Sequence, residues 1–553
     1  MKSLLDRTGM AVPLTLLGIG ALLFLYYVGA RDLWPTDEDE YAQISREMMR
    51  SGNWLLPTAN GEPWTIKPVL LNWLIALISL PFGDVTEFRA RFFSATGAMG
   101  SVMLTWFLGS RVFTPRTGII AALVLGTCVL FIQQGRWAQT YMLSTFFATL
   151  AIVCFFWGYT NPARRVTAYM TMYVATGLGV LTMGPVNLAM PGLVGLVFLI
   201  AMRDLWHIKD MMLVRGVLLF AAIAAPWYLY MAGQEDYSSD LLVKTNVTRF
   251  LDAWTHSQPW YYYLRDLLWS FAPWALFLPG ALILAFSKRS LEHRSGTVIA
   301  LVWFLSLLAF FSIADGKRPQ YLLAAYPAMA LLVGYLLDRA LLHWQDRFYR
   351  RAVLIPGLLL AVIAALAAVA VPIAAGNRNA DWVTPMLGVS VLAALLSAAL
   401  VVAWRKERPH LFVLAPVAFT LVMIVYCVHV LIPLADQGKT VRPYSEYLRS
   451  EIDSIPGTRW GMFRTYRARY VYYADHFTAD LRKDDDLLTF LEEPERAIVV
   501  IRMRDYDRLK DSLLADTSVL DHREIGSRNL LLISNRPPPG ATSPDQPESQ
   551  GQM

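Results

Sequence analysis

The sequence predicts an all-α polytopic membrane protein with about 13 transmembrane helices, followed by a small C-terminal soluble α/β domain. Of the 553 residues, 56% are hydrophobic and only 17% are charged, and the mean hydropathy is +0.40. These values exclude an ordinary soluble protein of this length. Apolar runs of membrane-spanning length recur as far as residue 434. Beyond residue 436 the chain is polar and alternates short β-like runs with helix-like runs.

The apolar runs are connected by loops whose charge alternates along the chain. Arginine and lysine concentrate in every second connection, for example at Arg164 and Arg165, and again at Arg405, Lys406 and Arg408. Basic loops face the cytoplasm, so this parity places the N-terminus inside. The candidate spans are residues 11–30, 92–110, 117–134, 142–158, 166–182, 187–202, 213–232, 268–286, 297–314, 321–338, 353–375, 385–403 and 411–434.

One further apolar stretch, PVLLNWLIALISLPF (68–82), is predicted not to cross the membrane. It is short, has proline near both ends and contains an asparagine, features that favour an interfacial or re-entrant helix. If it crossed, every later basic loop would move to the outer side. We therefore expect residues 31–91 to form one long external loop with interfacial helices.

The chain is thus predicted to have three parts. Residues 1–436 form the transmembrane domain, and residues 437–536 form an external α/β domain with β-like runs GMFRTY, AIVVIRM and NLLLIS. Residues 537–553 are rich in proline, serine and glutamine and are expected to be disordered. The three cysteines, Cys128, Cys154 and Cys427, lie inside apolar runs, so we expect them to pack rather than to form a disulfide or metal site.

Four consecutive acids, Asp37 to Glu40, follow the first span in the stretch WPTDEDEYAQISREMM (34–49). Apolar residues at three- and four-residue spacing after them, beginning with Tyr41, predict an amphipathic helix on the outer surface. Asp37 either caps this helix or has a functional role, because ionisable groups near hydrocarbon are usually functional. Glu38 to Glu40 either form a solvated helix start or bind a ligand.

Cationic residues occur in the other external segments. Lys67 stands directly before Pro68. It either anchors the chain at the membrane interface or binds a ligand. The tryptophan and tyrosine residues of 246–263 are typical of the aromatic belt at a membrane interface. Such a belt does not explain Arg249 in the same segment. One acidic stretch with several cations on the same side favours an anionic ligand, such as a phosphate, with a base nearby. The candidate residues in these segments are Lys67, Arg249, His256, Lys317, Arg318 and Tyr321.

The motifs of these segments resemble a known family. D-E-x-x-Y-A-x-x-S-R-E-M, followed by G-x-W-x-x-P, G-E-P-W and K-P, is similar to the first periplasmic loop of GT-C glycosyltransferases of the family-39 type. This family includes bacterial 4-amino-4-deoxy-L-arabinose lipid A transferases and is related to protein O-mannosyltransferases. R-F…H-S-Q-P-W-x-Y-Y and G-K-x-P-x-Y-L-L also match, and the resemblance covers residues 1–440.

The resemblance implies transfer of a sugar from a polyprenyl-phosphate donor to lipid A or another envelope glycolipid, with inversion at the anomeric carbon. It implies a bacterial inner-membrane protein whose active site and C-terminal domain face the periplasm. By position, Asp37 matches the catalytic carboxylate, while Lys67, Arg249 and Tyr321 match residues that hold the lipid phosphate. The other residues expected to bind substrate are Glu38, Tyr41, His256, Lys317 and Arg318.

The sequence departs from the family at two positions. Thr140 and Tyr141 stand where members usually have an aspartate, and Ile66 replaces an acid before the loop lysine. Both changes fall where a sugar or metal would be contacted, so no metal ligands are assigned. The phosphate of the donor already activates the sugar, and the sequence has no nucleotide-binding loop. We therefore expect no required cofactor, with a divalent metal as an unsupported alternative.

Three alternatives remain for the function. A protein O-glycosyltransferase of the mannosyltransferase type would use the same kind of donor. A lipid or sugar transporter would place ionisable residues at mid-membrane, and these spans carry almost none. A non-catalytic scaffold would leave the acids and cations of the external segments unexplained. The expected partners are the lipid-linked donor, the envelope acceptor and the lipid bilayer, and no nucleic acid.

Overall fold

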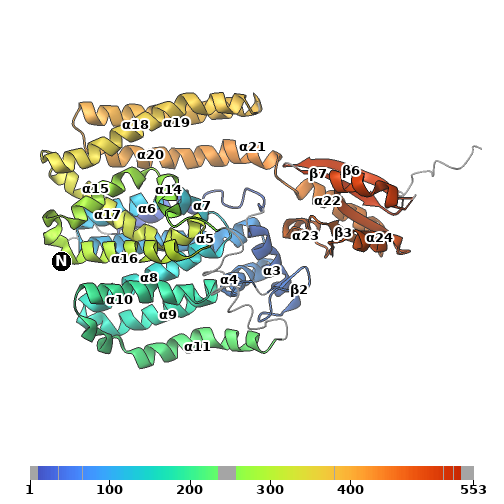
Figure 1. The fold of residues 1–553 in the computed structure, drawn as a ribbon, viewed down its shortest axis with the longest axis horizontal. Coiled ribbons are helices and arrows are strands. Elements are labelled where there is room, and N and C mark those ends of the chain that lie inside the picture. The colour runs from blue at the N-terminus through green and yellow to red at the C-terminus, as the bar shows by residue number, and fades with distance from the viewer. Residues whose placement is uncertain are drawn as a thin grey trace, which may run out of the picture. The chain divides into compact units, whose positions relative to one another are not determined.

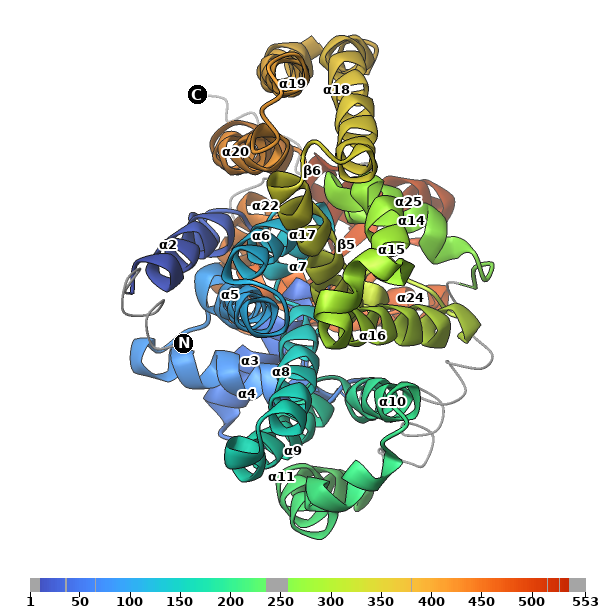
Figure 2. The ribbon, with the colours of Figure 1, turned by 90° about the vertical axis from the view of Figure 1, so that its left-hand side faces the viewer.

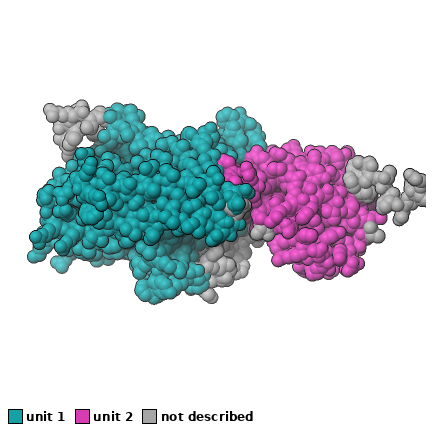
Figure 3. Space-filling model, turned by 90° about the horizontal axis from the view of Figure 1, so that it is seen from above, with its two compact units in different colours: residues 1–30, 53–57, 64–431 teal, residues 31–52, 58–63, 432–553 magenta. Residues whose placement is uncertain are grey.

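The computed structural model describes residues 10–34, 37–64, 66–234, 257–378, 380–514, 516–526 and 528–536. The chain consists of two compact units, which Figure 3 colours separately. Unit 1 comprises residues 1–30, 53–57 and 64–431, and unit 2 comprises residues 31–52, 58–63 and 432–553. The external loop predicted at 31–91 is therefore divided, and its first part belongs to the same unit as the C-terminal domain.

Unit 1 is helical throughout its described part (Figure 1). Its α-helices are α2 (Ala11–Gly20), α4 (Leu70–Ser79), α5 (Glu87–Val112), α6 (Pro115–Gly126), α7 (Val129–Gly135), α8 (Thr140–Thr160), α9 (Arg165–Met183), α10 (Val186–Ala201), α11 (Leu213–Ala232), α14 (Tyr262–Ser270), α15 (Leu278–Phe286), α16 (Arg294–Ile313), α17 (Tyr326–Leu342), α18 (Arg347–Gly376), α19 (Val383–Arg405) and α20 (Leu411–Tyr426). Short helical turns join several of them, including η1 (Ala21–Leu25), η2 (Leu80–Phe82), η8 (Pro319–Ala325) and η10 (Cys427–Leu431).

Within the described residues, nine helical segments are long and apolar enough to cross a membrane. Two bent helix pairs, α6 with α7 at 70° and α14 with α15 at 120°, raise this to eleven if each is one span. Shorter apolar helices cover Ala11–Leu25, Leu70–Phe82 and Val186–Ala201. The predicted polytopic helical membrane fold is confirmed. The count of about 13 stays a prediction, because it needs Ala11–Leu25 and Val186–Ala201 to cross as well.

The core of unit 1 is formed around α17, since 89% of the apolar window in Pro319–Leu342 is buried. A Cβ atom at Gly334 of α17 would lie 2.8 Å from the backbone nitrogen of Ala121 in α6, so only glycine allows this approach. By contrast α18 packs beside α19 at the edge of the unit, as Figure 2 shows, and most of its surface is exposed. Such an apolar exposed surface is expected where lipid surrounds a helix.

Side-chain caps define where several long helices begin. The Thr86 hydroxyl accepts the Arg89 backbone N–H at 3.4 Å before α5, and Thr114 accepts the Thr117 N–H at 3.0 Å before α6. Asp346 accepts the Phe348 N–H at 2.8 Å before α18. These bonds satisfy backbone donors that a helix start leaves without partners.

The burial of the cysteines agrees with the prediction that they pack inside the helical unit. Cys128 and Cys154 are buried, and Cys427 is half-buried.

Unit 2 contains a five-stranded mixed sheet in the order β4-β3-β5-β7-β6 and a separate two-stranded hairpin. Strands β3, β4 and β5 are parallel, whereas β7 runs antiparallel to β5 and β6. The elements are α3 (Glu38–Ser51), β1 (Thr58–Ala59), β2 (Glu62–Pro63), α21 (Ile432–Gln437), α22 (Arg442–Ser454), β3 (Arg459–Phe463), α23 (Ala468–Ala474), β4 (Ala479–Leu481), α24 (Asp484–Glu492), β5 (Ala497–Arg502), α25 (Met503–Leu509), β6 (Ser518–Ile525) and β7 (Arg528–Ser534).

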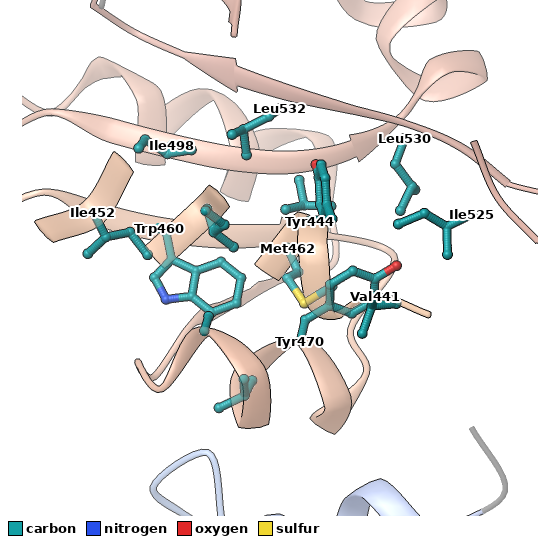
Figure 4. Packing of buried hydrophobic residues seen from close by; sticks show 14 residues of the cluster. Val441, Tyr444, Ile452, Trp460, Met462, Tyr470, Ile498, Ile525, Leu530 and Leu532 are labelled. Carbon is teal, nitrogen blue, oxygen red and sulfur yellow. The ribbon is translucent and has the colours of Figure 1, made fainter. Parts of the chain in front are cut away.

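The sheet buries both of its faces. On one face Ile498, Val500, Leu530 and Leu532 pack against Tyr470 and the rest of a cluster shown in Figure 4. The alternate residues of β5 and β7 pack on the other face with α24 and α25. Strands buried on both sides appear in a sequence as continuous apolar runs, which is why GMFRTY, AIVVIRM and NLLLIS predicted strands correctly.

Candidate active site

The predicted catalytic carboxylate lies at the start of α3. Asp37 occupies the N-cap position, but its side chain makes no capping hydrogen bond. Its φ is +73°, in the left-handed region that non-glycine residues seldom adopt, although aspartate tolerates it better than most. The interpretation of Asp37 as a helix cap is therefore wrong. Strained backbone held in this way occurs preferentially at functional sites.

The two acids after Asp37 are buried, so the prediction of a solvated helix start is wrong for them. Glu38 is 0% exposed and forms an ion pair with Arg31, whose guanidinium lies 4.2 Å from the centroid of the Trp34 ring. Asp39 is 3% exposed and accepts the backbone N–H of Arg469 at 3.2 Å. Burial raises the pKa of Asp39 to about 6, against the opposing effect of the Arg469 charge.

The helix itself is amphipathic as predicted, but it is embedded in unit 2. Tyr41 is fully buried, and α3 packs against α23 and β1. Ten of its residues, beginning with Glu38 and ending with Met48, are buried. The expectation of a helix lying on an outer surface is therefore wrong, because an amphipathic pattern does not distinguish a lipid surface from a protein partner.

Glu47, in the S-R-E-M part of the motif, organises the loop that follows α3. Its carboxylate accepts hydrogen bonds from Gln43 Nε2 at 2.7 Å, Thr58 Oγ1 at 2.8 Å, Asn60 N at 2.6 Å and Gly61 N at 3.1 Å. Asn60 and Gly61 both have positive φ and turn β1 into β2. This role was not predicted from the sequence, although Asn-Gly between two extended residues is a strong hairpin signal.

Replacing Glu47 with alanine is expected to lower the stability of unit 2. Four donors would lose their acceptor, but only Gln43 is buried, and the other three donors can be partly hydrated. We expect a loss of about 1–3 kcal/mol, measured by thermal unfolding of the purified protein, with faster proteolysis between α3 and β2. Glu62→Ala, at an exposed position of the same hairpin, is the control. Equal melting temperatures for the two variants would contradict this role of Glu47.

In unit 1 Lys67 lies beside Tyr141, whose ring in turn lies close to that of Tyr321. Lys67 Nζ is 5.2 Å from the centroid of the Tyr141 ring, which is within the range of a cation–π interaction. The Tyr141 ring lies 5.9 Å from the Tyr321 ring, and the Tyr321 ring lies 6.2 Å from the Phe311 ring. The structure thus brings together Lys67 and Tyr321, two residues predicted to hold a lipid phosphate, through a third residue that was not assigned a role.

Tyr141 is placed by the start of α8. The residue before it, Thr140, is the first residue of that helix, and both side chains are buried. Sequence analysis noted these two positions only as the place where family members have an acid. An aromatic face in that place provides Lys67 with a contact that carries no full charge.

The Lys317 side chain is buried and donates hydrogen bonds to backbone carbonyls of the protein. It is 4% exposed, and its ammonium donates to the carbonyl of Gln258 at 2.8 Å and to that of Ala314. Burial lowers the pKa of Lys317, which lies in the connection between two candidate spans. These bonds tie residue 258 to the 314–318 turn, so the geometry assigns Lys317 to holding the loop.

Arg318 is the remaining predicted site residue that the structure describes. Arg318 precedes η8, and its carbonyl accepts the Tyr263 hydroxyl at 3.3 Å. Arg249 and His256 lie outside the described residues. Among the residues that are described, no group of three His, Cys, Asp or Glu side chains could hold a metal ion. The expectation of no required cofactor stays a prediction.

Comparison with known proteins identifies the family. A family model described as dolichyl-phosphate-mannose-protein mannosyltransferase matches residues 66–230. An undecaprenyl phosphate-alpha-4-amino-4-deoxy-L-arabinose arabinosyl transferase from Pseudomonas fluorescens is 30% identical over 429 residues, which are 70% of this chain and 74% of the relative. This chain belongs to that arabinosyl transferase family. The predicted resemblance to GT-C glycosyltransferases is confirmed.

Other members of the arabinosyl transferase family match as well. A second enzyme of this name from Pseudomonas fluorescens is 32% identical over 70% of this chain, which spans 65% of that relative's length. The crystal structure of ArnT from Cupriavidus metallidurans bound to undecaprenyl phosphate has a TM-score of 0.79. It covers 95% of this chain and 98% of its own at 20% identity, so the two proteins share a fold.

Proposed function

We propose that this chain transfers a sugar from a polyprenyl-phosphate donor to lipid A, or to another envelope glycolipid, with inversion at the anomeric carbon. The names of the curated relatives support undecaprenyl phosphate as the carrier and aminoarabinose as the sugar. The positive-inside pattern supports a bacterial inner membrane protein whose reaction takes place on the periplasmic side.

The observation that carries the proposal is the Lys67 ammonium held against Tyr141 and near Tyr321, in a chain of this family. Negative charge develops on the phosphate oxygen as its bond to the anomeric carbon breaks. A positioned cation stabilises that charge and so lowers the barrier. In this proposal Lys67 and Tyr321 bind the donor phosphate, and Arg249 has the same role.

Asp37 is proposed to act on the acceptor. Its carboxylate accepts the proton of an attacking hydroxyl, or orients an attacking acceptor phosphate that needs no deprotonation. The acceptor oxygen then bonds to the anomeric carbon on the face opposite the departing phosphate, which gives inversion. The polyprenyl phosphate leaves with the electrons of the broken bond, and no cofactor is required for this balance.

Mass spectrometry of lipid A tests the proposal directly. Lipid A is compared from cells that contain the wild-type protein, the Asp37→Asn protein or neither, at equal expression. We expect a sugar-sized mass increase with the wild type alone. If the increase is absent and appears instead on periplasmic glycoproteins, the protein O-glycosyltransferase alternative suggested by the mannosyltransferase family model is correct.

A further inference from the structure

Unit 2 contains five arginines that form no ion pair within the described part of the chain, and four of them gather at one end of its sheet. Most other arginines of its sheet domain do pair with carboxylates. The paired residues include Arg464, Arg482, Arg496, Arg504, Arg508 and Arg523. The exceptions are Arg536, which donates to the carbonyl of Pro494, and a group of four. That group consists of Arg467, Arg469, Arg502 and Arg528, hereafter the four-arginine cluster. Cationic side chains gathered without matching acids are typical of an anion-binding surface.

Two members of the four-arginine cluster extend the strands β5 and β7 on one face of the sheet. Val500 and Leu530 pack with Tyr470 on that face. Residues two apart in a strand point to the same face, so Arg502 follows Val500 and Arg528 precedes Leu530 on it. Because β5 and β7 are antiparallel and Arg502 pairs with Leu530, both arginines lie at the same end of the sheet.

The other two members come from the start of α23, which covers the same face. Arg467 is the N-cap residue of α23, and Arg469 stands beside Tyr470 with its guanidinium 5.5 Å from that ring. Arg469 is 7% exposed, and its Nη1 donates to the carbonyl of Lys439 at 3.2 Å. Its buried Nε has no hydrogen-bond partner. A buried donor without a partner needs an acceptor, which a bound anion, a ligand or a water molecule can supply.

The electrostatics agree with this placement. Burial lowers the pKa of Arg528, and the charges of Arg467, Arg502 and Arg469 lower it further. The four-arginine cluster is therefore close enough for mutual repulsion. Asp39 lies near one member, since it accepts the Arg469 backbone N–H and interacts with the Arg469 charge. Among the described residues no carboxylate forms an ion pair with any of the four arginines, so an anionic ligand would relieve their mutual repulsion.

The topology of the sheet gives an independent reason to expect a ligand here. The parallel neighbours β3 and β5 are followed by helices on opposite faces, because α23 packs with Tyr470 on one face and α25 with Leu509 on the other. In open α/β sheets, ligands bind outside the carboxyl ends of strands at such a switch point. Arg467 and Arg469 follow β3, and Arg502 ends β5, so the cluster occupies that position.

We propose that the four-arginine cluster of unit 2 binds phosphate groups of the acceptor glycolipid. This inference rests on the proposed function only for the identity of the acceptor. The planar guanidinium group donates two parallel hydrogen bonds to a phosphate, so arginine suits this ligand better than lysine. The contact of Asp39 with Arg469 connects the cluster to the start of α3, where Asp37 lies. Acceptor phosphates bound here would be held within the same unit as the proposed base.

Binding of lipid A to the full-length protein in nanodiscs, without donor, tests the proposal. The test variant is Arg467→Gln/Arg502→Gln. The matched control is Arg482→Gln/Arg508→Gln, which removes the same charge from two ion-paired arginines of the same domain. We expect lipid A to bind at least about tenfold more weakly to the test variant and unchanged to the control. Wild-type protein should also prefer lipid A to lipid A whose phosphates have been removed.

Several results would overturn the proposal. An equal loss in both double variants would show general attraction to charge, and unchanged binding in the test variant would show that the cluster does not bind lipid A. Inorganic phosphate binding as tightly as lipid A would assign the cluster to free phosphate. The single variant Arg467→Gln, at an exposed position, replaces the double variant if that one fails to fold. If the test variant bound lipid A as tightly as the wild type and transferred sugar normally, the cluster would not be a binding site. The proposed function would remain supported.

Discussion

Replacing Asp37 with asparagine is expected to lower the rate of sugar transfer by about 100- to 10,000-fold, the range of a lost general base. Asparagine is nearly the same size, and it adopts the left-handed conformation at least as readily as aspartate. The backbone at φ +73° can therefore be retained, and the melting temperature of the variant should match the wild type. The measurements are the transfer rate with purified donor and acceptor and the thermal unfolding of both proteins.

Two further variants show whether the carboxylate or the backbone matters at position 37. Glycine adopts the left-handed conformation without strain, so the Asp37→Gly protein should be as stable as the wild type. Its rate of sugar transfer should be as low as that of Asp37→Asn. Glu40→Gln removes a neighbouring half-buried acid and should retain most of the activity. If Asp37→Asn transferred sugar at the wild-type rate, Asp37 would not be the base. A non-catalytic scaffold would give that result.

Much of the fold could be predicted because it depends on periodic patterns. Long apolar runs predicted the helices of unit 1, and short apolar runs predicted β3, β5 and β7. The packing of α3 was not predictable in the same way. Its apolar stripe predicts a helix that buries one side, but not that α23 of the C-terminal domain supplies the partner. The burial of Glu38 likewise depends on Arg31, which belongs to no recognisable motif.

The candidate site shows the same division. Position in a motif was enough to single out Lys67 and Tyr321, and the structure brings them together through Tyr141. Lys317 belongs to an equally clear motif, yet its ammonium binds two carbonyls of its own loop. A sequence motif shows that a cation is present, but only the fold shows which groups of the protein contact it.

Replacing Lys67 with alanine is expected to lower the transfer rate by about 100- to 1,000-fold, as for other groups that stabilise a developing negative charge. Lys67→Arg retains both the charge and the contact with an aromatic face, so it should keep a substantial part of the activity. Donor binding should weaken as well, and so should inhibition by free undecaprenyl phosphate. The measurements are kcat, KM for the lipid-linked donor and the inhibition constant of undecaprenyl phosphate.

The aromatic partner of Lys67 allows the position of the ammonium to be tested separately from its charge. Tyr141→Phe keeps the ring face and should act as the wild type, whereas Tyr141→Leu removes it. A cation–π interaction contributes about 0.5–2 kcal/mol, so Tyr141→Leu should weaken transfer by about 2- to 30-fold. In the Lys67→Ala protein the same substitution should have almost no additional effect, because the interaction is already absent. If the losses in activity were additive, Tyr141 would act independently of Lys67. If the Lys67→Ala protein turned over the donor at the normal rate, Lys67 would not bind the donor phosphate.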